Sequence, residues 1–110
     1  MESLKKGQAF KEVYNHRQSA ANGLLVLYVR KNGLWVNRYG ISVSRKVGNA
    51  VMRNRTRRLI KEQIRLHEKE LAIGYDLVVI ARVAAGKSDF SQIGQSLLSL
   101  LARQNLRSMK

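Results

Sequence analysis

The sequence predicts a small α+β fold, a two-layer α/β sandwich in which helices pack on a mixed β-sheet. Two observations indicate strands: β-rich runs occupy residues 24–30 and 75–82. A third observation indicates helices, because apolar residues recur at helical spacing in three other segments. With 110 residues, 45% of them hydrophobic, the chain is expected to form one domain over residues 1–110.

The first predicted element is a helix from residue 4 to about residue 17. One face of this helix is expected to pack on the sheet, because four residues recur near helical spacing: Leu4, Phe10, Val13 and Tyr14. Gly7 weakens the pattern, because glycine in a helix interior costs about 1 kcal/mol relative to alanine.

A β-hairpin is the simplest interpretation of the next two runs. Residues 24–30 and 35–44 are both rich in strand-forming residues, and a turn-like Lys-Asn-Gly sequence separates them. Alternation along the second run places Ile41 on a core face and Gly40 on an open face.

A long amphipathic helix is predicted from Asn49, the expected N-cap, to about residue 69. Residues on its apolar side recur at three- and four-residue spacing. The predicted apolar side consists of Met52, Leu59, Ile60, Gln63, Ile64 and Leu66.

The last two elements are a buried central strand over residues 75–82 and a C-terminal helix. Ser88 is the expected N-cap of that helix, which is predicted to end before the basic tail 103–110. Its apolar stripe, expected to cover the sheet, consists of Phe90, Ile93, Leu97, Leu100 and Leu101.

Charge indicates a polyanionic partner. Lys and Arg total 21 against 7 Asp and Glu, a formal net charge of +14 that favours nucleic acid. The longest apolar run, residues 23–29, is far shorter than the ~20 residues that span a bilayer, so no membrane partner is expected. The N-terminus lacks the apolar core of a secretion signal, and a cytoplasmic location is the default expectation.

The positive charge concentrates between residues 45 and 65, where Glu62 is the only acid. Steps of ~100° around the long helix bring Asn54, Arg57, Arg58, Lys61 and Arg65 into one polar arc. Arginine suits phosphate because its planar fork makes paired hydrogen bonds to phosphate oxygens. A solvated helix face is the ordinary alternative for a charge run, but the lack of balancing acids argues against it here.

The segment Ile-Ser-Val-Ser-Arg-Lys-Val-Gly-Asn-Ala-Val-Met-Arg-Asn-Arg-Thr-Arg-Arg-Leu-Ile, residues 41–60, closely resembles the signature of the bacterial ribonuclease P protein family. The resemblance extends to an N-terminal Leu-Lys-Lys at residues 4–6 and to the run Tyr-Asp-Leu-Val-Val-Ile-Ala-Arg at residues 75–82. It implies a protein that binds the catalytic RNA of ribonuclease P and contacts the 5′ leader of precursor tRNA through a cleft. Catalysis would reside in the RNA and in Mg²⁺ held mainly by it.

The resemblance also implies which residues touch RNA. Aromatic residues matching those of the leader cleft are Phe10, Tyr14 and Tyr28, where a base can stack for roughly 1 to 3 kcal/mol. For Phe10, packing of the first helix on the sheet is an equal alternative. Residues matching the basic strand end and the Arg-Asn-Arg helix, together with Arg65 of the same polar arc, are the expected contacts to the catalytic RNA: Arg45, Lys46, Arg53, Asn54, Arg55, Arg57, Arg58, Lys61 and Arg65.

Independent catalysis by the protein is not expected. His16 and His67 are the only histidines, there is no cysteine, and the seven acids are scattered without a metal-ligand or acid/base pattern. No catalytic residue and no protein-held metal or cofactor is therefore assigned. A ribosomal or other structured-RNA-binding protein and a DNA-binding regulator remain as alternatives, and only the Arg-Asn-Arg signature separates them strongly from the first interpretation.

Overall fold

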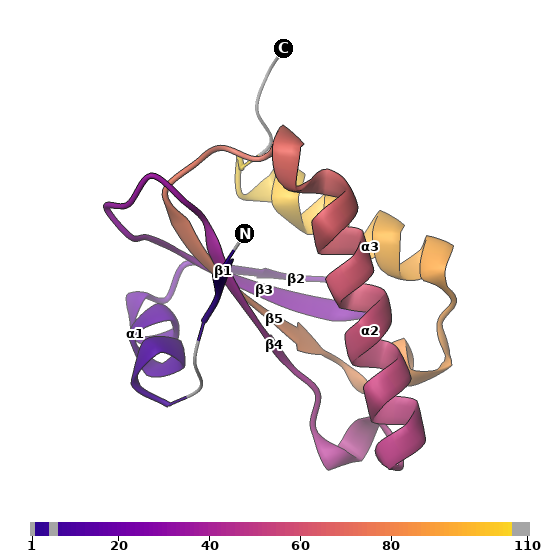
Figure 1. The fold of residues 1–110 in the computed structure, drawn as a ribbon. Coiled ribbons are helices and arrows are strands. Elements are labelled where there is room, and N and C mark those ends of the chain that lie inside the picture. Colours follow the sequence, from indigo (N-terminus) through magenta and orange to yellow (C-terminus); the bar gives the residue numbers. More distant parts are fainter. Residues whose placement is uncertain (1, 5–6, 107–110) are drawn as a thin grey trace.

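The computed structural model describes residues 2–4 and 7–106, which form a five-stranded mixed sheet with helices on both faces (Figure 1). Lys5, Lys6 and residues 107–110 of the basic tail lie outside the described residues. The predicted α+β class, with helices packed on a mixed sheet, is confirmed. The elements are β1 (Glu2–Ser3), α1 (Gln8–His16), β2 (Ser19–Ala21), β3 (Leu25–Lys31), β4 (Arg38–Ser42), α2 (Ala50–His67), β5 (Tyr75–Ala81) and α3 (Phe90–Arg103), with short 3-10 turns η1 (Arg45–Val47), η2 (Glu68–Glu70) and η3 (Val83–Lys87).

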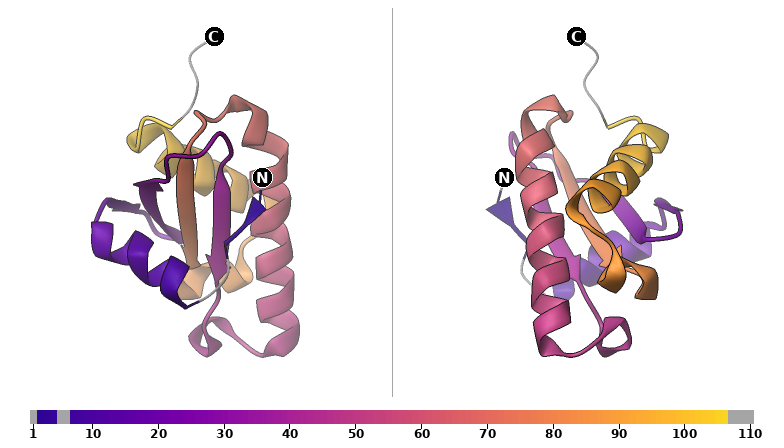
Figure 2. Two further views of the ribbon diagram at one scale, coloured as in Figure 1. Left: turned by 60° about the vertical axis from the view of Figure 1, so that its left-hand side comes forward. Right: turned by 90° about the vertical axis from the view of Figure 1, so that its right-hand side faces the viewer.

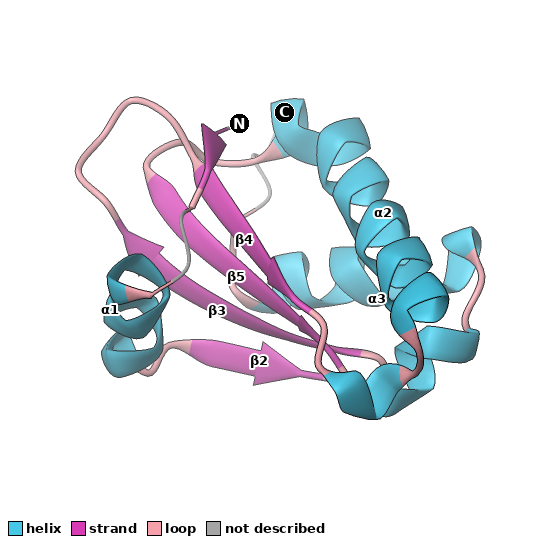
Figure 3. Cartoon of the chain, turned by 60° about the horizontal axis from the view of Figure 1, so that its bottom comes forward, coloured by secondary structure: helices cyan, strands magenta, loops and turns pink. Residues whose placement is uncertain are grey.

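The strand order is β1-β4-β5-β3-β2, so β3 and β4 are not neighbours and the predicted hairpin is wrong (Figure 3). Strand β5 lies between them, parallel to β4 and antiparallel to β3. The physical reason is burial: β5 is the most apolar strand, and the central position covers both of its faces. Its predicted central place is confirmed.

Helix α1 packs on one face of the sheet, and α2 and α3 pack together on the other (Figure 2). Alternation along the strands sorts the side chains: Leu27 and Val79 enter the larger core beneath α2 and α3, whereas Val78 enters a smaller core beneath α1. Gly40 is on the α1 side and is buried, because the ring of Phe10 lies directly over it. The face that was expected to be open at Gly40 is therefore occupied.

The N-terminal segment begins as a strand, and the predicted helix start at residue 4 is wrong. Leu4 lies after β1 and is buried in the core beneath α1. The helix starts at Gln8 because Gly7, with φ 92°, has a backbone conformation that favours glycine and does not continue into a helix.

The first part of the predicted strand 35–44 is a loop. Trp35 is 92% exposed, and β4 covers only residues 38–42. Asn37 holds the loop, because its Oδ1 accepts hydrogen bonds from the backbone N–H groups of Gly74 and Tyr75, both at 2.8 Å. These bonds join the loop to the segment before β5 and explain why strand pairing starts later than the sequence pattern indicates.

Helix α2 confirms its predicted N-cap, since Asn49 Oδ1 accepts a hydrogen bond from the Met52 N–H at 2.9 Å. Leu66 was expected on the apolar side but is 53% exposed. The buried side of the helix is centred near Ile60, and Leu66 lies about 120° around the helix from it. Thr56 is fully buried instead, and its hydroxyl donates to the Met52 carbonyl.

The N-cap of α3 is Asp89, not Ser88 as predicted. Asp89 accepts from the Gln92 N–H, and the Gln92 side chain accepts from the Asp89 N–H, which forms a capping box. Ser88 instead ends η3 and donates to the Ala84 carbonyl. Four members of the predicted apolar stripe are buried, but Phe90 at the helix start is 40% exposed, and the helix runs on to Arg103.

Candidate RNA-binding surfaces

The exposed side of α2 carries the positive charge that the sequence places there. Burial of Ile60, Gln63 and Ile64 against the sheet and α3 turns the opposite side of the helix to solvent. Asn54, Arg58, Lys61 and Arg65 are exposed and Arg57 is half-buried, as the predicted polar arc requires. The structure therefore brings these five side chains onto one surface.

The two arginines of the Arg-Asn-Arg segment also form hydrogen bonds to backbone carbonyls of the protein. Arg53 donates from Nη1 to the Gly48 carbonyl at 3.2 Å, and Arg55 donates from Nη1 to the Ser88 carbonyl at 3.2 Å. Both side chains are half-buried, on the flanks of α2 rather than in its exposed arc. A guanidinium has five N–H donors, so each arginine keeps further donors for a phosphate.

The remaining cations of α2 differ in how far they are engaged. Arg57 donates to Asn54 Oδ1 at 3.1 Å, and Arg65 pairs with Glu62 at 2.8 Å. The hydrogen bond from Arg65 lowers the pKa of the Glu62 carboxyl below its usual value. Arg58 and Lys61 make no hydrogen bond or ion pair with any other residue among those described. These two side chains are the most available cations on the helix.

Arg45 and Lys46 were expected at a basic strand end. They lie instead in η1, after β4 has ended at Ser42, and both are exposed. The turn leads directly into Asn49 and the N-terminus of α2, where free backbone N–H groups and the helix dipole favour an anion. The two side chains therefore extend the positive surface beyond the start of α2.

The three predicted leader-contact aromatics form one cluster beneath α1. The Phe10 and Tyr14 rings meet edge to face with centroids 6.3 Å apart, and the Tyr14 and Tyr28 rings with centroids 4.9 Å apart. Phe10 is only 8% exposed, whereas Tyr14 and Tyr28 are half-buried. Burial, followed by the neighbouring Tyr28, raises the pKa of Tyr14. Phe10 thus packs the helix on the sheet, while the two tyrosines keep exposed edges.

The same face of the sheet continues past the aromatic cluster, and sequence reasoning did not assign this part. Val26 and Ile80 are opposite each other in the β3–β5 register and are both half-buried. Ser42 on β4 continues the row beside Ile80. Strand alternation puts Val26 on the same face as Tyr28, but the sequence could not identify the neighbours of Val26, because these depend on the strand order. Val26, Ile80 and Ser42 extend the tyrosine surface.

Arg30 and Arg38, on the same face, both form ion pairs with carboxylates. Arg38 donates from Nε and Nη2 to Asp76 at 2.8 and 2.7 Å, and Asp76 is 1% exposed. These hydrogen bonds raise the pKa of the Arg38 guanidinium. Arg30 pairs with Glu12 at 2.9 Å, which ties α1 to β3. Both arginines therefore stabilise the α1 side of the fold.

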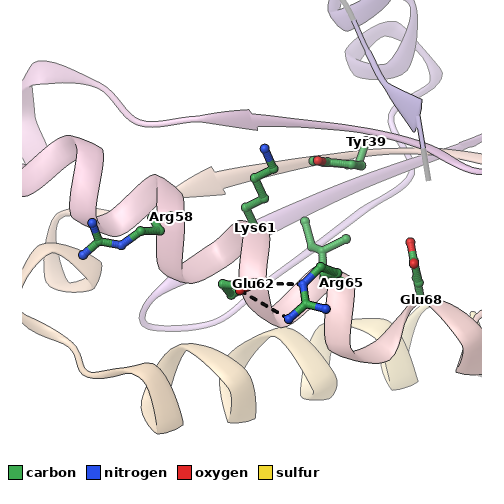
Figure 4. A pocket seen from close by; sticks show the side chains of 7 residues that line it. Tyr39, Arg58, Lys61, Glu62, Arg65 and Glu68 are labelled. Atoms are coloured by element: carbon green, nitrogen blue, oxygen red, sulfur yellow. Dashed lines mark hydrogen bonds and ion pairs between the residues drawn. The ribbon is translucent and has the colours of Figure 1, made fainter.

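A cavity of about 620 Å³ opens between the C-terminal half of α2 and strand β4 (Figure 4). Tyr39 lines it from β4, and the other labelled side chains come from α2 and the turn that follows. They are Arg58, Lys61, Glu62, Arg65 and Glu68. Nothing in the sequence pattern pointed to this cavity, because it exists only where β4 and α2 come together.

Within residues 2–4 and 7–106, no group of three or more His, Asp or Glu side chains is arranged to hold a metal ion. In the same part of the chain, no helix is both long and apolar enough to cross a membrane.

Comparison with known proteins places these surfaces in context. A family model described as Ribonuclease P matches residues 1–105. The chain is 48% identical over 112 residues to the ribonuclease P protein component of Clostridium perfringens (strain SM101 / Type A), covering 96% of this chain and 90% of that protein. Its fold is similar to the solved RNase P protein of Staphylococcus aureus, with TM-score 0.89, 35% identity and coverage of 98% and 99%. It is also similar to the RNase P protein of Thermotoga maritima, with TM-score 0.84, 34% identity and coverage of 94% and 97%.

Proposed function

Because the chain belongs to the ribonuclease P protein family, we propose that α2 binds the catalytic RNA of that enzyme and that the tyrosine surface beneath α1 contacts the 5′ leader of precursor tRNA. The family provides the RNA-binding protein component of a ribonucleoprotein endoribonuclease that acts in tRNA processing. In this division of labour the catalytic RNA and its Mg²⁺ ions cleave the phosphodiester bond, and the protein, acting as one domain over residues 1–110, supplies binding.

The observation that carries the proposal is the availability of cations on α2. Arg58 and Lys61 are exposed and have no hydrogen bond or ion pair with the rest of the described chain. Charges left unpaired on one side of a helix repel each other unless an anion meets them. RNA is a suitable anion because its phosphates are regularly spaced and because binding releases condensed cations.

The proposed contacts to the catalytic RNA differ in kind. Arg53 and Arg55 would bind RNA through the N–H donors that their hydrogen bonds to backbone carbonyls leave unused. Substitution of either arginine would therefore also remove a hydrogen bond at the N-terminal end of α2 or α3. The contacts that would act mainly through charge and hydrogen bonding at the surface are Arg45, Lys46, Asn54, Arg57, Arg58, Lys61 and Arg65.

The leader contact is supported by the exposed edges of Tyr14 and Tyr28 beside the apolar Val26–Ile80 row. A base of a single strand can stack on such a ring without a sequence requirement. Phe10 would contribute indirectly, because its buried ring packs over Gly40 and holds α1 on the sheet. Since only precursor tRNA has a leader, this contact would favour substrate over product.

The salt dependence of RNA binding tests the assignment of α2. Replacing both free cations, in the variant Arg58→Ala/Lys61→Ala, should weaken binding to the cognate catalytic RNA. The slope of log K against log salt should fall in magnitude by about 2, because two phosphate contacts are lost. Filter binding over a series of KCl concentrations measures both quantities.

The matched control is Lys11→Ala/Lys31→Ala, which removes the same charge from exposed positions on α1 and at the end of β3. It should change the slope much less. An equal slope change in both variants would mean that net charge, rather than the α2 surface, determines affinity. An unchanged slope in the α2 variant would exclude Arg58 and Lys61 as phosphate contacts.

A further inference from the structure

The cavity between α2 and β4, which we call the Tyr39 pocket, combines three kinds of group. Its labelled lining consists of Tyr39, Arg58, Lys61, Glu62, Arg65 and Glu68, and Ile64 also lines it. The volume of about 620 Å³ lies within the range of pockets that accept small organic ligands or single nucleotides. It therefore offers an aromatic ring, cations and carboxylates along one pocket.

Among the described residues that line the pocket, Tyr39 is the one aromatic. Its ring is half-buried, since it packs against the larger core, and its hydroxyl has no hydrogen bond with any other described residue. In Figure 4 the hydroxyl end points toward the ammonium group of Lys61. Tyr39 and Lys61 also line an adjoining groove of about 350 Å³ that leads toward Phe10. The pocket thus has an open approach along the edge of the sheet.

The charges of the pocket are arranged unevenly. Glu62 is engaged by Arg65, and Glu68 lies close enough to Arg65 to raise the pKa of that guanidinium further. With two carboxylates and one guanidinium, this group of three residues has a net negative charge, so Arg58 and Lys61 are the cations of the pocket that remain available to a phosphate. A carboxylate has about four lone-pair positions, so Glu62 can still accept a hydrogen bond from an amino group.

Carboxylates are unexpected on a surface that binds phosphates, because they repel the RNA backbone. They are compatible with RNA when a base, rather than a phosphate, faces them, since the amino and imino groups of bases are hydrogen-bond donors. A ring for stacking, cations for a phosphate and acceptors for a base edge together match one nucleotide. A peptide helix would require a wider apolar lining than Tyr39 and Ile64 provide.

We propose that the Tyr39 pocket receives one unpaired nucleotide of the catalytic RNA, with its base stacked on Tyr39 and its phosphate held by Arg58 and Lys61. The proposal rests on the proposed role of α2 and adds a base-stacking residue outside that helix. It predicts that loss of the Tyr39 ring lowers the affinity for the RNA without changing how that affinity depends on salt.

Substitution of Tyr39 separates stacking from charge. Tyr39→Leu keeps apolar volume against the core but removes the ring, and it should raise the Kd for the cognate catalytic RNA about 5- to 150-fold. The slope of affinity against KCl should stay that of the wild type, because no phosphate contact is lost. Tyr39→Phe should bind like the wild type. Trp35→Leu, which removes a 92% exposed aromatic ring that does not line the pocket, should also have no effect.

The outcomes distinguish this proposal from the assignment of α2. If Tyr39→Leu binds like the wild type while Arg58→Ala/Lys61→Ala loses affinity and slope, the pocket proposal is wrong and the α2 assignment stands. If neither variant changes binding, both are wrong. A loss confined to precursor tRNA binding would make substrate, and not the catalytic RNA, the occupant and would overturn the proposal.

Ultraviolet crosslinking of the wild-type complex tests the same contact without a substitution, in case Tyr39→Leu impairs folding. Mass spectrometry of the digested complex should identify a nucleotide of an unpaired segment attached to Tyr39. Crosslinks at other aromatic residues with none at Tyr39 would contradict the proposal.

Discussion

Individual side chains on α2 have different structural roles, although in the sequence they look alike. Arg53 and Arg55 are half-buried and bind backbone carbonyls, whereas Arg58 and Lys61 are exposed and have no hydrogen bond or ion pair with another residue that the structure describes. The positions of the cations were predictable, because charged residues can be read from the sequence. Their hydrogen-bond partners were not predictable, because the carbonyl that accepts from Arg55 belongs to Ser88, 33 residues away.

Aromatic residues that look alike in the sequence also have different structural roles. Phe10 and Tyr14 differ by one helical turn, yet Phe10 is buried over Gly40 and Tyr14 keeps an exposed edge beside Tyr28. Helical spacing predicts that both side chains face the sheet. It cannot predict which of them lies over a glycine, because that depends on β4.

Tyr28 gives the sharpest test of the leader contact. Tyr28→Leu should weaken binding of precursor tRNA to the assembled enzyme by about 1 to 3 kcal/mol, the range for loss of one stacked base, with little effect on mature tRNA. Affinities of both tRNAs for holoenzymes with wild-type or variant protein measure the difference. Tyr28→Phe is the control and should retain the preference. Equal losses for precursor and mature tRNA would mean that Tyr28 acts only in packing.

At the scale of elements, periodicity predicted the long segments and failed for the short ones. Helices α2 and α3 and strands β3 and β5 were anticipated because each carries a sustained apolar pattern. Strands β1 and β2, with two and three residues, are too short to show alternation. The hairpin prediction failed because strand pairing depends on which strand is most apolar, not on which runs are adjacent in sequence.

The contact between α1 and β4 can be tested through its glycine. A Cβ added at Gly40 would collide with the Phe10 ring, so Gly40→Ala should lower the free energy of unfolding by about 1 to 3 kcal/mol. Urea unfolding followed by circular dichroism measures the change. Gly23→Ala is the matched control, since an added Cβ there meets no atom within 4 Å. Equal stabilities of the two variants would refute close packing of Phe10 on β4.

At the scale of the whole molecule, the two faces of one sheet carry two candidate RNA surfaces. The α1 side presents Tyr14, Tyr28 and the apolar row beyond them, and the α2 side presents the free cations. The sequence predicted the fold class and both residue sets. The Tyr39 pocket was not predictable, because it forms only where α2, on its path from β4 to β5, lies beside Tyr39.

Charge at this scale explains how such a protein assists an RNA enzyme. Two RNAs repel each other on approach, and a chain of net charge +14 between them screens their phosphates and releases bound cations. The protein should therefore lower the Mg²⁺ concentration that the reaction requires, without contributing a catalytic group.

Cleavage of precursor tRNA by the cognate catalytic RNA at low Mg²⁺ tests this account most directly. The reaction is followed with the RNA alone, with RNA and protein together, and with the protein alone. We expect strong stimulation by the protein and no cleavage by the protein alone. Cleavage by the protein alone, or no stimulation at any Mg²⁺ concentration, would contradict the assignment of an RNA-binding accessory subunit.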